Sequence, residues 1–582
     1  MNAPERVVRF DPGMPAEVAR VERLLVLQGS DLNEVVTRRE RFAQTQLLFI
    51  DPGLLDDAAM RGLPNLRFVP LDTDPDFQAR AASEALSLAT LVDLRLSRLR
   101  ASIWPGARLQ GWDVALFQLP LQRLHVSREL GRAFAAAWDG SRLALLRPAA
   151  VQRMYFDSSL SADLFTEGAP GLFEPAGAYE AVLHSPAAPL ASVLDAGLLR
   201  QAMAGGHVTL LTHLPTCYYD RDWLARQISR AHRFTLDLPS PYWDVPVHRG
   251  ASPVVATERA DRAHLAQAQR YAEQAREVLE ETLGHLMREP QARAAQLDEW
   301  STRCCWQALS YLALRDGLSG TRPAFLLADQ DTGLNGPLFS VADELGSSLL
   351  VVPHSGHPST LLPHGRLVRV IERPGFGTTA RTVLGQAIVA EPVRMQPRLP
   401  RQPRTAVRRI CLMLNAIHAV GLNHFEISAL ASFHAALAGQ CRAIGVELSV
   451  RTKPNAPAVC LLSSFLREDP QALIAHVSRP LPEVAAQSDI CITFGEPTTG
   501  ILPFLESGCL VLHVSPQRWP TDYLTCLPLI HAGVIPSLDG AAGVQYLHRM
   551  MVNPAAFAEA SRLQGEAFEL RAAPARADLF QG

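Results

Sequence analysis

The sequence predicts an α/β protein whose parallel sheets are covered by helices on both faces. Its 582 residues suffice for about two to four domains. Hydrophobic residues make up 48% of the chain and charged residues 19%. The chain can therefore bury large cores, and disordered, collagen-like and heptad-built proteins are excluded. Short apolar runs alternate with helical patterns, as in parallel strands joined by helices.

Charge and cysteine content indicate which partners and cofactors the protein is expected to bind. The 55 basic and 58 acidic residues give a net charge of −3, which argues against nucleic acid as a partner. None of the nine cysteines stands in a C-x-x-C pair, so we expect no metal and no other cofactor. The sequence shows neither a signal peptide nor an apolar stretch of about 18 residues that could span a membrane. We expect a cytoplasmic protein, and peripheral contact with the inner face of the membrane stays open.

Residues 1–250 either form an N-terminal α/β domain or enlarge the unit that follows. Apolar runs predict strands at 24–27, 46–50, 66–71, 113–118, 141–146 and 207–212. Amphipathic patterns predict helices at 84–103 and 123–138.

Residues 251–394 combine two long helices with a βαβ unit. Helical spacing predicts the helices at 256–289, with Pro290 ending the first, and at 294–315. Strands follow at 324–330 and 348–352, joined by a helix that ends at Glu344. Their loops open at the carboxyl ends of the strands, where open α/β sheets bind ligands.

A linker and a second α/β unit complete the chain. Residues 395–405 carry three prolines and three arginines without apolar periodicity, which predicts a solvated, semi-rigid hinge; attraction to anionic lipid headgroups is the alternative. In residues 406–582 the sequence predicts strands at 408–414, 445–450, 489–494 and 509–514, with helices at 424–438 and 459–467 and one that follows the turn 495–500 and ends at 507.

Lys453 is the only lysine among the 55 basic residues. A lysine on a solvated face could be replaced by arginine at little cost, whereas a compact ammonium group in a pocket could not. We therefore expect a specific role for Lys453.

The C-terminal unit carries the pattern that most strongly indicates a function. A strand leads into Arg451-Thr-Lys-Pro-Asn455, a later strand leads into Gly495-Glu-Pro-Thr-Thr-Gly500, and Glu506-Ser-Gly precedes a valine-rich strand. This half resembles the nucleotide-sugar-binding domain of GT-B glycosyltransferases, especially bacterial capsule and lipopolysaccharide enzymes of the sialyl or Kdo type. The resemblance implies two Rossmann-like domains that face a cleft, with the N-terminal α/β region added to them.

The resemblance implies a donor site in the C-terminal domain. Hydroxyl and N–H groups of Thr498, Thr499 and Gly500 at a helix start can bind a donor phosphate, and Lys453 can add a positive charge. Glu506 would accept hydrogen bonds from ribose. The simpler readings are a helix cap for the threonines and a solvated position for Glu506. The expected donor-binding residues are completed by Asn415, His418, Gly421 and Asn423 in the loop after the first strand, and by Arg451, Pro454 and Glu496.

The sequence departs from the family pattern in two places. Lys453-Pro454 stands where the family commonly has His-Pro. Glu496 and Glu506 lie further apart than the Glu-x7-Glu pair of many retaining enzymes, so we expect inversion at the sugar.

Inverting transfer needs a general base near the acceptor hydroxyl. Asp331 is the first candidate, with Asp329 and His357 after it, because all three lie at or just beyond the carboxyl ends of predicted strands. The two aspartates could equally cap a helix. His354, His357 and His364 lack a carboxylate or cysteine at metal-binding spacing, so we expect no zinc.

These observations predict a glycosyltransferase that moves a hexosyl, sialyl or Kdo-type sugar from a CMP-, UDP- or GDP-sugar. The acceptor would be a surface glycan, a lipid-linked glycan or a protein. A nucleotide-sugar 2-epimerase and a non-catalytic binding or scaffold protein of the same fold are the alternatives. The sequence leaves the oligomeric state and the role of residues 1–250 open.

Overall fold

The computed structural model describes residues 22–27, 29–51, 54–55, 58–59, 61–73, 77–107, 112–139, 143–145, 160–173, 193–205, 210–213, 235–237, 256–257, 260–320, 325–329, 335–352, 368–372, 380–383, 386–392, 399–414, 427–452, 466, 469–495, 498–515, 529–530 and 532–571. Within these residues the α/β class is confirmed, and the strands form three larger parallel or mostly parallel sheets and one small pair.

The N-terminal sheet has four parallel strands in the order β3-β2-β1-β4. The strands are β1 (Arg23–Val26), β2 (Gln46–Phe49), β3 (Leu66–Phe68) and β4 (Ala144–Leu145), and α1 (Gly29–Thr37) follows β1. The runs at 24–27, 46–50, 66–71 and 141–146 are thus confirmed as strands. Continuous apolar runs are what a parallel strand buried on both faces requires.

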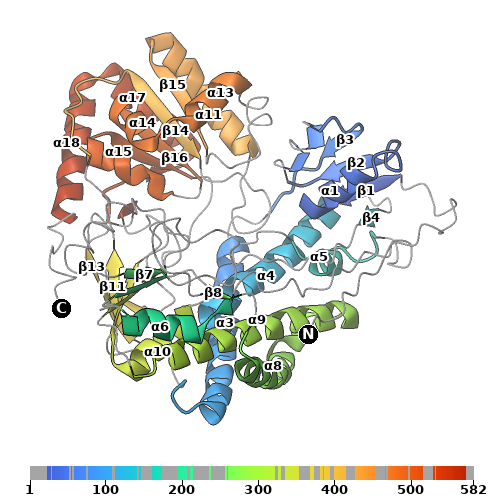
Figure 1. Ribbon diagram of the computed structural model, residues 1–582. Coiled ribbons are helices and arrows are strands. Elements are labelled where there is room, and N and C mark those ends of the chain that lie inside the picture. The colour runs from blue at the N-terminus through green and yellow to red at the C-terminus, as the bar shows by residue number, and fades with distance from the viewer. Residues whose placement is uncertain are drawn as a thin grey trace.

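Four long helices pack against one another and form what we call the helical body (Figure 1). They are α3 (Phe77–Ile103), α4 (Val114–Ala137), α8 (Arg262–Leu283), which continues as the 3-10 turn η2 (Gly284–Leu286), and α9 (Pro290–Gly317). The pairs α3 and α4, α3 and α8, and α8 and α9 are in contact, and the short α5 (Ala162–Gly168) packs on α4. The prediction that Pro290 ends the first long helix is wrong, because α8 ends at Leu283. Pro290 is instead the first residue of α9, where its missing N–H costs nothing.

The strand predicted at 113–118 is wrong, because these residues begin α4. Val114, Leu116 and Phe117 are all buried in the core between the helices. A helix start that is enclosed on several sides shows the same short apolar run as a buried strand, so periodicity does not separate the two.

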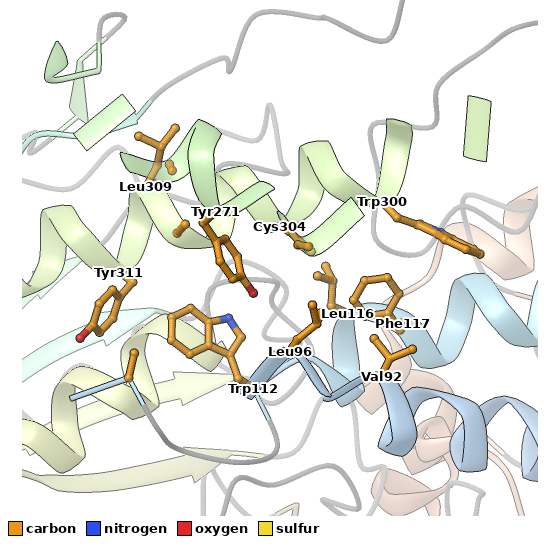
Figure 2. Packing of buried hydrophobic residues seen from close by; sticks show 14 of the residues in the cluster. Val92, Leu96, Trp112, Leu116, Phe117, Tyr271, Trp300, Cys304, Leu309 and Tyr311 are labelled. Atoms are coloured by element: carbon orange, nitrogen blue, oxygen red, sulfur yellow. The ribbon is translucent and has the colours of Figure 1, made fainter. Parts of the chain in front are cut away.

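The centre of the helical body is aromatic. Figure 2 shows Trp112, Tyr271 and Tyr311 converging there, with ring centroids 5.3 Å apart for Trp112 and Tyr311. The ring centroids of Trp104 and Tyr271 are also 5.3 Å apart. The guanidinium of the fully buried Arg100 lies 4.4 Å from the centre of the Trp112 ring. These rings fill the space where α3, α8 and α9 meet.

The second sheet has seven strands in the order β12-β13-β11-β10-β9-β6-β7. The strands are β6 (Leu210–His213), β7 (Thr235–Asp237), β9 (Phe325–Asp329), β10 (Ser348–Val352), β11 (Val368–Glu372), β12 (Ala380–Val383) and β13 (Gln386–Pro392), and only β12 runs antiparallel to its neighbour. Helices α6 (Ala196–Gly205) and α10 (Asn335–Leu345) pack on α9. The small pair β5 (Val193–Leu194) and β8 (Ala256–Thr257) is antiparallel. Because residues 256 and 257 belong to β8, α8 begins six residues after the predicted position at 256.

The strand pairings divide residues 1–250 between the two predicted alternatives. Strands β1 to β4 form a sheet of their own. Strands β6 and β7 belong to the following unit, because β6 pairs with β9 along Leu210–His213. The sequence obscures the pairing because α8 and α9 are inserted between β7 and β9.

The C-terminal unit has a five-stranded parallel sheet in the order β15-β14-β16-β17-β18. Its elements are β14 (Arg409–Leu414), α11 (Ile427–Ile444), β15 (Glu447–Arg451), α13 (Pro470–Ser478), α14 (Leu481–Gln487), β16 (Ile490–Phe494), η3 (Thr499–Ile501), α15 (Leu502–Ser507), β17 (Leu510–Val514), β18 (Ser537–Leu538), α17 (Gly540–Val552) and α18 (Pro554–Arg571). Alternate residues of β14 enter two different cores, with Ile410 and Leu412 in one and Cys411 and Met413 in the other. Both faces are therefore covered by helices, as predicted.

The described half of the linker is fastened to this C-terminal unit. The backbone N–H of Gln402 donates to the carbonyl of Ser507 at 2.9 Å. Arg404 donates to the carbonyl of Ala486 at 2.6 Å and lies 3.6 Å from the carboxylate of Asp489. Residues 399–405 are coil and mostly exposed, as predicted, but these bonds attach them to the domain, so they do not form a free hinge.

Among the described residues, no helix is both long and apolar enough to span a bilayer.

Candidate functional site

The topology of the five-stranded sheet singles out one edge for ligand binding. Numbered in chain order, its strands lie in the order 2-1-3-4-5, so the direction of winding reverses between β14 and β16. In such sheets ligands bind outside the carboxyl ends of the strands at that reversal. Met413 is in register with Arg451 on β15 and with Thr493 on β16. The three strands thus end together, and the segments that follow them start at this edge.

Most of the predicted donor residues belong to these segments. Asn415, His418, Gly421 and Asn423 follow β14, Lys453 and Pro454 follow β15, and Glu496 follows β16. All seven lie outside the described residues, so their role stays a prediction. The strands that lead to them are described, and they place the starts of the three segments along one edge.

The turn after β16 is described at both ends. Gly495 adopts a φ of 72°, and its N–H donates to the carbonyl of Val514 at 2.9 Å. At the other end, a Cβ on Gly500 would lie 2.7 Å from the terminal methyl of Met413. Gly495 is favoured by its positive φ, and a larger residue at position 500 would require the end of the Met413 side chain to shift.

Thr498 acts as a cap for the short helix that follows it. Its hydroxyl oxygen accepts a hydrogen bond from the N–H of Gly500 at 3.3 Å. The N–H group of Gly500 is thus already bound within the chain. The interpretation of Thr498 as a helix cap therefore agrees with the structure. Only the backbone of Thr499 is described, as the first residue of η3.

Arg451 is placed at the carboxyl end of β15 and is buried. Its Nη1 donates to the carbonyl of His476 on α13 at 2.8 Å. Burial and the nearby Arg479 both lower the pKa of Arg451 from its ordinary value. The residue therefore ties α13 to the sheet directly below the segment that begins with Lys453.

Glu506 does not lie where ribose binding requires it. It is near the end of α15, just before β17, and thus near the amino edge of the sheet. Its carboxylate is buried and accepts a hydrogen bond from the N–H of Leu399 at 3.4 Å. We correct the expectation accordingly: Glu506 holds the linker, because the six-residue α15 carries it from one edge of the sheet to the other.

His513 was missed in the sequence, although it is the best-connected polar residue near this edge. Its Nε2 lies 2.8 Å from the carbonyl oxygen of Gly495, and its Nδ1 lies 2.7 Å from the hydroxyl of Ser537. Burial lowers the pKa of the imidazole. The signal in the sequence was a single polar residue within the apolar strand Leu510–Val514.

The seven-stranded sheet has a corresponding reversal. Its strands β6, β7, β9, β10 and β11 also lie in the order 2-1-3-4-5, with the reversal between β6 and β9. Asp329 is the last residue of β9, at that reversal. Asp331 and His357 follow β9 and β10 and, like the side chain of Asp329, lie outside the described part of the structure. Within the described part of the chain, no group of three His, Cys, Asp or Glu residues could hold a metal ion.

Comparison with known proteins gives structural matches only. No family model matches the chain, and the search of curated proteins finds no significant match. Solved structures do match. A spinosyn rhamnosyltransferase, SpnG, solved with the spinosyn aglycone, is 17% identical, with a TM-score of 0.35, over 64% of this chain and 98% of that one.

Two further solved structures give similar values. The calicheamicin glycosyltransferase CalG4 is 14% identical, with a TM-score of 0.35, over 64% of this chain and 97% of that one. MurG of Acinetobacter baumannii is 10% identical, with a TM-score of 0.35, over 64% and 98%. With TM-scores of this size, the assignment of an α/β fold with two doubly wound sheets rests on the strand orders of the chain itself.

Proposed function

We propose that the chain is a GT-B-type glycosyltransferase that transfers a sugar from a nucleotide-activated donor with inversion. The observation that carries this proposal is the 2-1-3-4-5 strand order, which occurs in the five-stranded sheet and among five strands of the seven-stranded sheet. Two doubly wound sheets supply two ligand-binding edges, one for a nucleotide donor and one for an acceptor. The polar segments of the sequence follow the strands that end at those edges.

The proposed donor site is the edge of the five-stranded sheet. Lys453 would place its ammonium group against the donor phosphate, and Thr499 would add a hydroxyl or N–H donor from the turn after β16. Asn415, His418, Gly421, Asn423, Pro454 and Glu496 would line the same edge. Arg451 supports it from below through its bond to His476. The donor would be a CMP-, UDP- or GDP-sugar carrying a hexosyl, sialyl or Kdo-type residue.

The proposed reaction is a single displacement. The acceptor hydroxyl gives its proton to the carboxylate of Asp331, or of Asp329, as its oxygen bonds to the anomeric carbon. The bond from that carbon to the phosphate oxygen breaks, and the nucleotide leaves with the negative charge. Lys453 and Thr499 stabilise that charge, which develops only in the transition state. The acceptor would be a glycan, a lipid-linked glycan or a protein, in the cytoplasm or at the inner face of the membrane.

Calorimetry with a panel of CMP, UDP, GDP and dTDP tests the donor site. We expect one nucleotide to bind the wild-type chain, and Lys453→Ala and Thr499→Ala to weaken that binding by at least about ten-fold, since each removes a hydrogen bond to a charged group. Arg442→Ala is the matched control, because it removes an exposed cation from α11 of the same unit. Equal affinity in all four proteins would refute the assignment of the site.

Incubation with the matching nucleotide sugar then separates the classes of function. Transfer or slow donor hydrolysis supports the proposal. Formation of an epimer would make the chain a nucleotide-sugar epimerase, and binding without turnover would make it a binding protein.

A further inference from the structure

A histidine in the middle of an otherwise apolar strand needs a physical reason. All five residues of β17, Leu510–Val514, are buried, and His513 is 2% exposed. An imidazole at such a position costs free energy unless its polar nitrogens are satisfied. The pairing of β17 with β16 and β18 uses backbone groups, so it does not call for a histidine.

Both nitrogens of His513 have partners, and the partners determine the positions of the protons. The carbonyl oxygen of Gly495, 2.8 Å from Nε2, can only accept, so Nε2 carries the hydrogen. Burial lowers the pKa of this imidazole, which keeps the ring neutral. Nδ1 therefore accepts from the hydroxyl of Ser537 at 2.7 Å. The carbonyl of Gly495 thus fixes the tautomer in which Nε2 donates, and Ser537 helps to orient the ring.

The hydrogen bond from His513 acts on the point where the chain leaves the sheet. Gly495 is the first residue after β16, and its φ of 72° turns the backbone away from the strand direction. Its N–H is already bound to Val514 on β17, and His513 binds its carbonyl. Both polar groups of one peptide position are therefore held by adjacent residues of the neighbouring strand.

The turn is held at its far end by contact with the same layer of side chains. Met413, Thr493 and His513 are in register across β14, β16 and β17. Gly500 rests on the methyl group of Met413. His513 thus contacts the first residue of the turn, Gly495, and Met413 contacts its last residue, Gly500.

We propose that His513, oriented by Ser537, is a positioning residue that holds the turn 495–500 in the geometry needed to bind the donor phosphate. This inference rests on the proposed function and adds to it a residue that need not touch the donor. Loss of the Nε2–H bond releases the carbonyl of Gly495, and the turn then samples other positions. The groups of the turn would meet the phosphate less often, and donor affinity would fall.

Three variants distinguish the effect of the Nε2–H hydrogen bond from the effect of the shape of the side chain. His513→Leu fills much of the space without a donor. His513→Gln keeps an N–H donor at a similar reach. Ser537→Ala leaves the imidazole in place but removes the hydroxyl that orients it. His434→Leu on α11 is the matched control, because it removes a buried imidazole from the same unit at another element.

The first measurement is hydrogen–deuterium exchange of peptides that cover residues 494–501. We expect exchange to become about ten-fold faster in His513→Leu, to rise less in Ser537→Ala, and to stay near the wild-type rate in His513→Gln and His434→Leu. The second is calorimetry with the nucleotide that binds the wild-type chain. Affinity should fall about ten-fold in His513→Leu and recover in His513→Gln. In turnover, KM for the donor should rise more than kcat falls.

The outcomes are distinguishable. Unchanged exchange at 494–501 in His513→Leu would overturn the inference, and so would faster exchange with unchanged nucleotide affinity. If His513→Leu does not fold, Ser537→Ala and His513→Gln decide by the same two readouts. If the wild-type chain binds none of the four nucleotides, the proposed function fails, and the exchange rates still show whether His513 holds the turn.

Discussion

Arg100 places a guanidinium in the centre of the helical body with two carboxylates around it. It is fully buried, forms a close ion pair with Asp113 and lies 3.7 Å from Asp93. The N–H of Asp113 also donates to Asp93 at 2.8 Å. With both carboxylates ionised, the cluster carries one excess negative charge away from water. Burial accordingly raises the pKa of Asp113 to about 6, against the attraction of Arg100 and with the help of Asp93.

The raised pKa predicts a pH dependence of stability. A carboxyl group that is a weaker acid when folded stabilises the fold below its unfolded pKa of 3.8 and loses that contribution as pH rises to about 6. The full change is worth roughly 3 kcal/mol. We expect the wild-type free energy of unfolding to fall between pH 4.5 and pH 7.5 relative to that of Asp113→Asn, as measured by urea titration. Parallel curves for the two proteins would contradict this expectation.

At the scale of elements, α10 is joined to the helical body by close contacts at both ends. Near its start, Gly336 lies so close to Trp112 that a Cβ would overlap the indole ring. Near its end, the carboxylate of Glu344 accepts a hydrogen bond from the Tyr311 hydroxyl at 2.5 Å, and Gly106 leaves room for it. The helix that follows β9, and hence the segment with Asp331, therefore depends on the turn between α3 and α4.

A methyl group at Gly336 tests this dependence. Gly336→Ala forces α10 and Trp112 apart, and overpacking of this kind costs about 2 kcal/mol. Gly439→Ala is the control, because Gly439 is exposed on α11 with nothing within 4 Å of its Cβ position. It should stabilise the chain by roughly 0.5 to 1 kcal/mol. Thermal unfolding of both variants shows whether Gly336→Ala lowers the stability and Gly439→Ala raises it, as expected.

The elements that could be predicted from the sequence are those whose pattern depends only on residues close together in the chain. The strands at 46–50 and 348–352 were found because a buried parallel strand is a continuous apolar run. The same rule failed at Phe117, where a helix is enclosed on several sides. Glu506 was misplaced because its edge of the sheet depends on the length of α15. His513 was missed because its partners, Gly495 and Ser537, are brought to it only by the pairing of three strands.

At the scale of the whole molecule, the chain consists of a four-stranded sheet, a helical body and two doubly wound sheets (Figure 1). The last of these units begins earlier than its first strand. Leu399, Gln402 and Arg404 bind Glu506, Ser507 and Asp489, and Arg401 contacts Gly565 of α18 closely. The linker segment 399–405 is thus part of the five-stranded unit.

Two truncated chains test where this unit begins. A chain of residues 399–582 should fold cooperatively and be more stable than residues 406–582 by about 2 to 4 kcal/mol, because the shorter chain loses several hydrogen bonds and leaves Glu506 and Asp489 with fewer partners. Guanidinium titrations followed by circular dichroism measure the difference. Equal midpoints for the two chains would contradict the assignment of residues 399–405 to the unit.

The attachment of residues 399–405 at Ser507 and Asp489 also determines at which edge of the five-stranded sheet the preceding chain enters the unit. Both residues precede strands, so the polypeptide from the rest of the molecule arrives at the amino side of the sheet. A five-residue strand is about 16 Å long. A pull transmitted along the chain from Leu399 is therefore applied one strand length away from Gly495, at the edge of the sheet opposite to the proposed donor site.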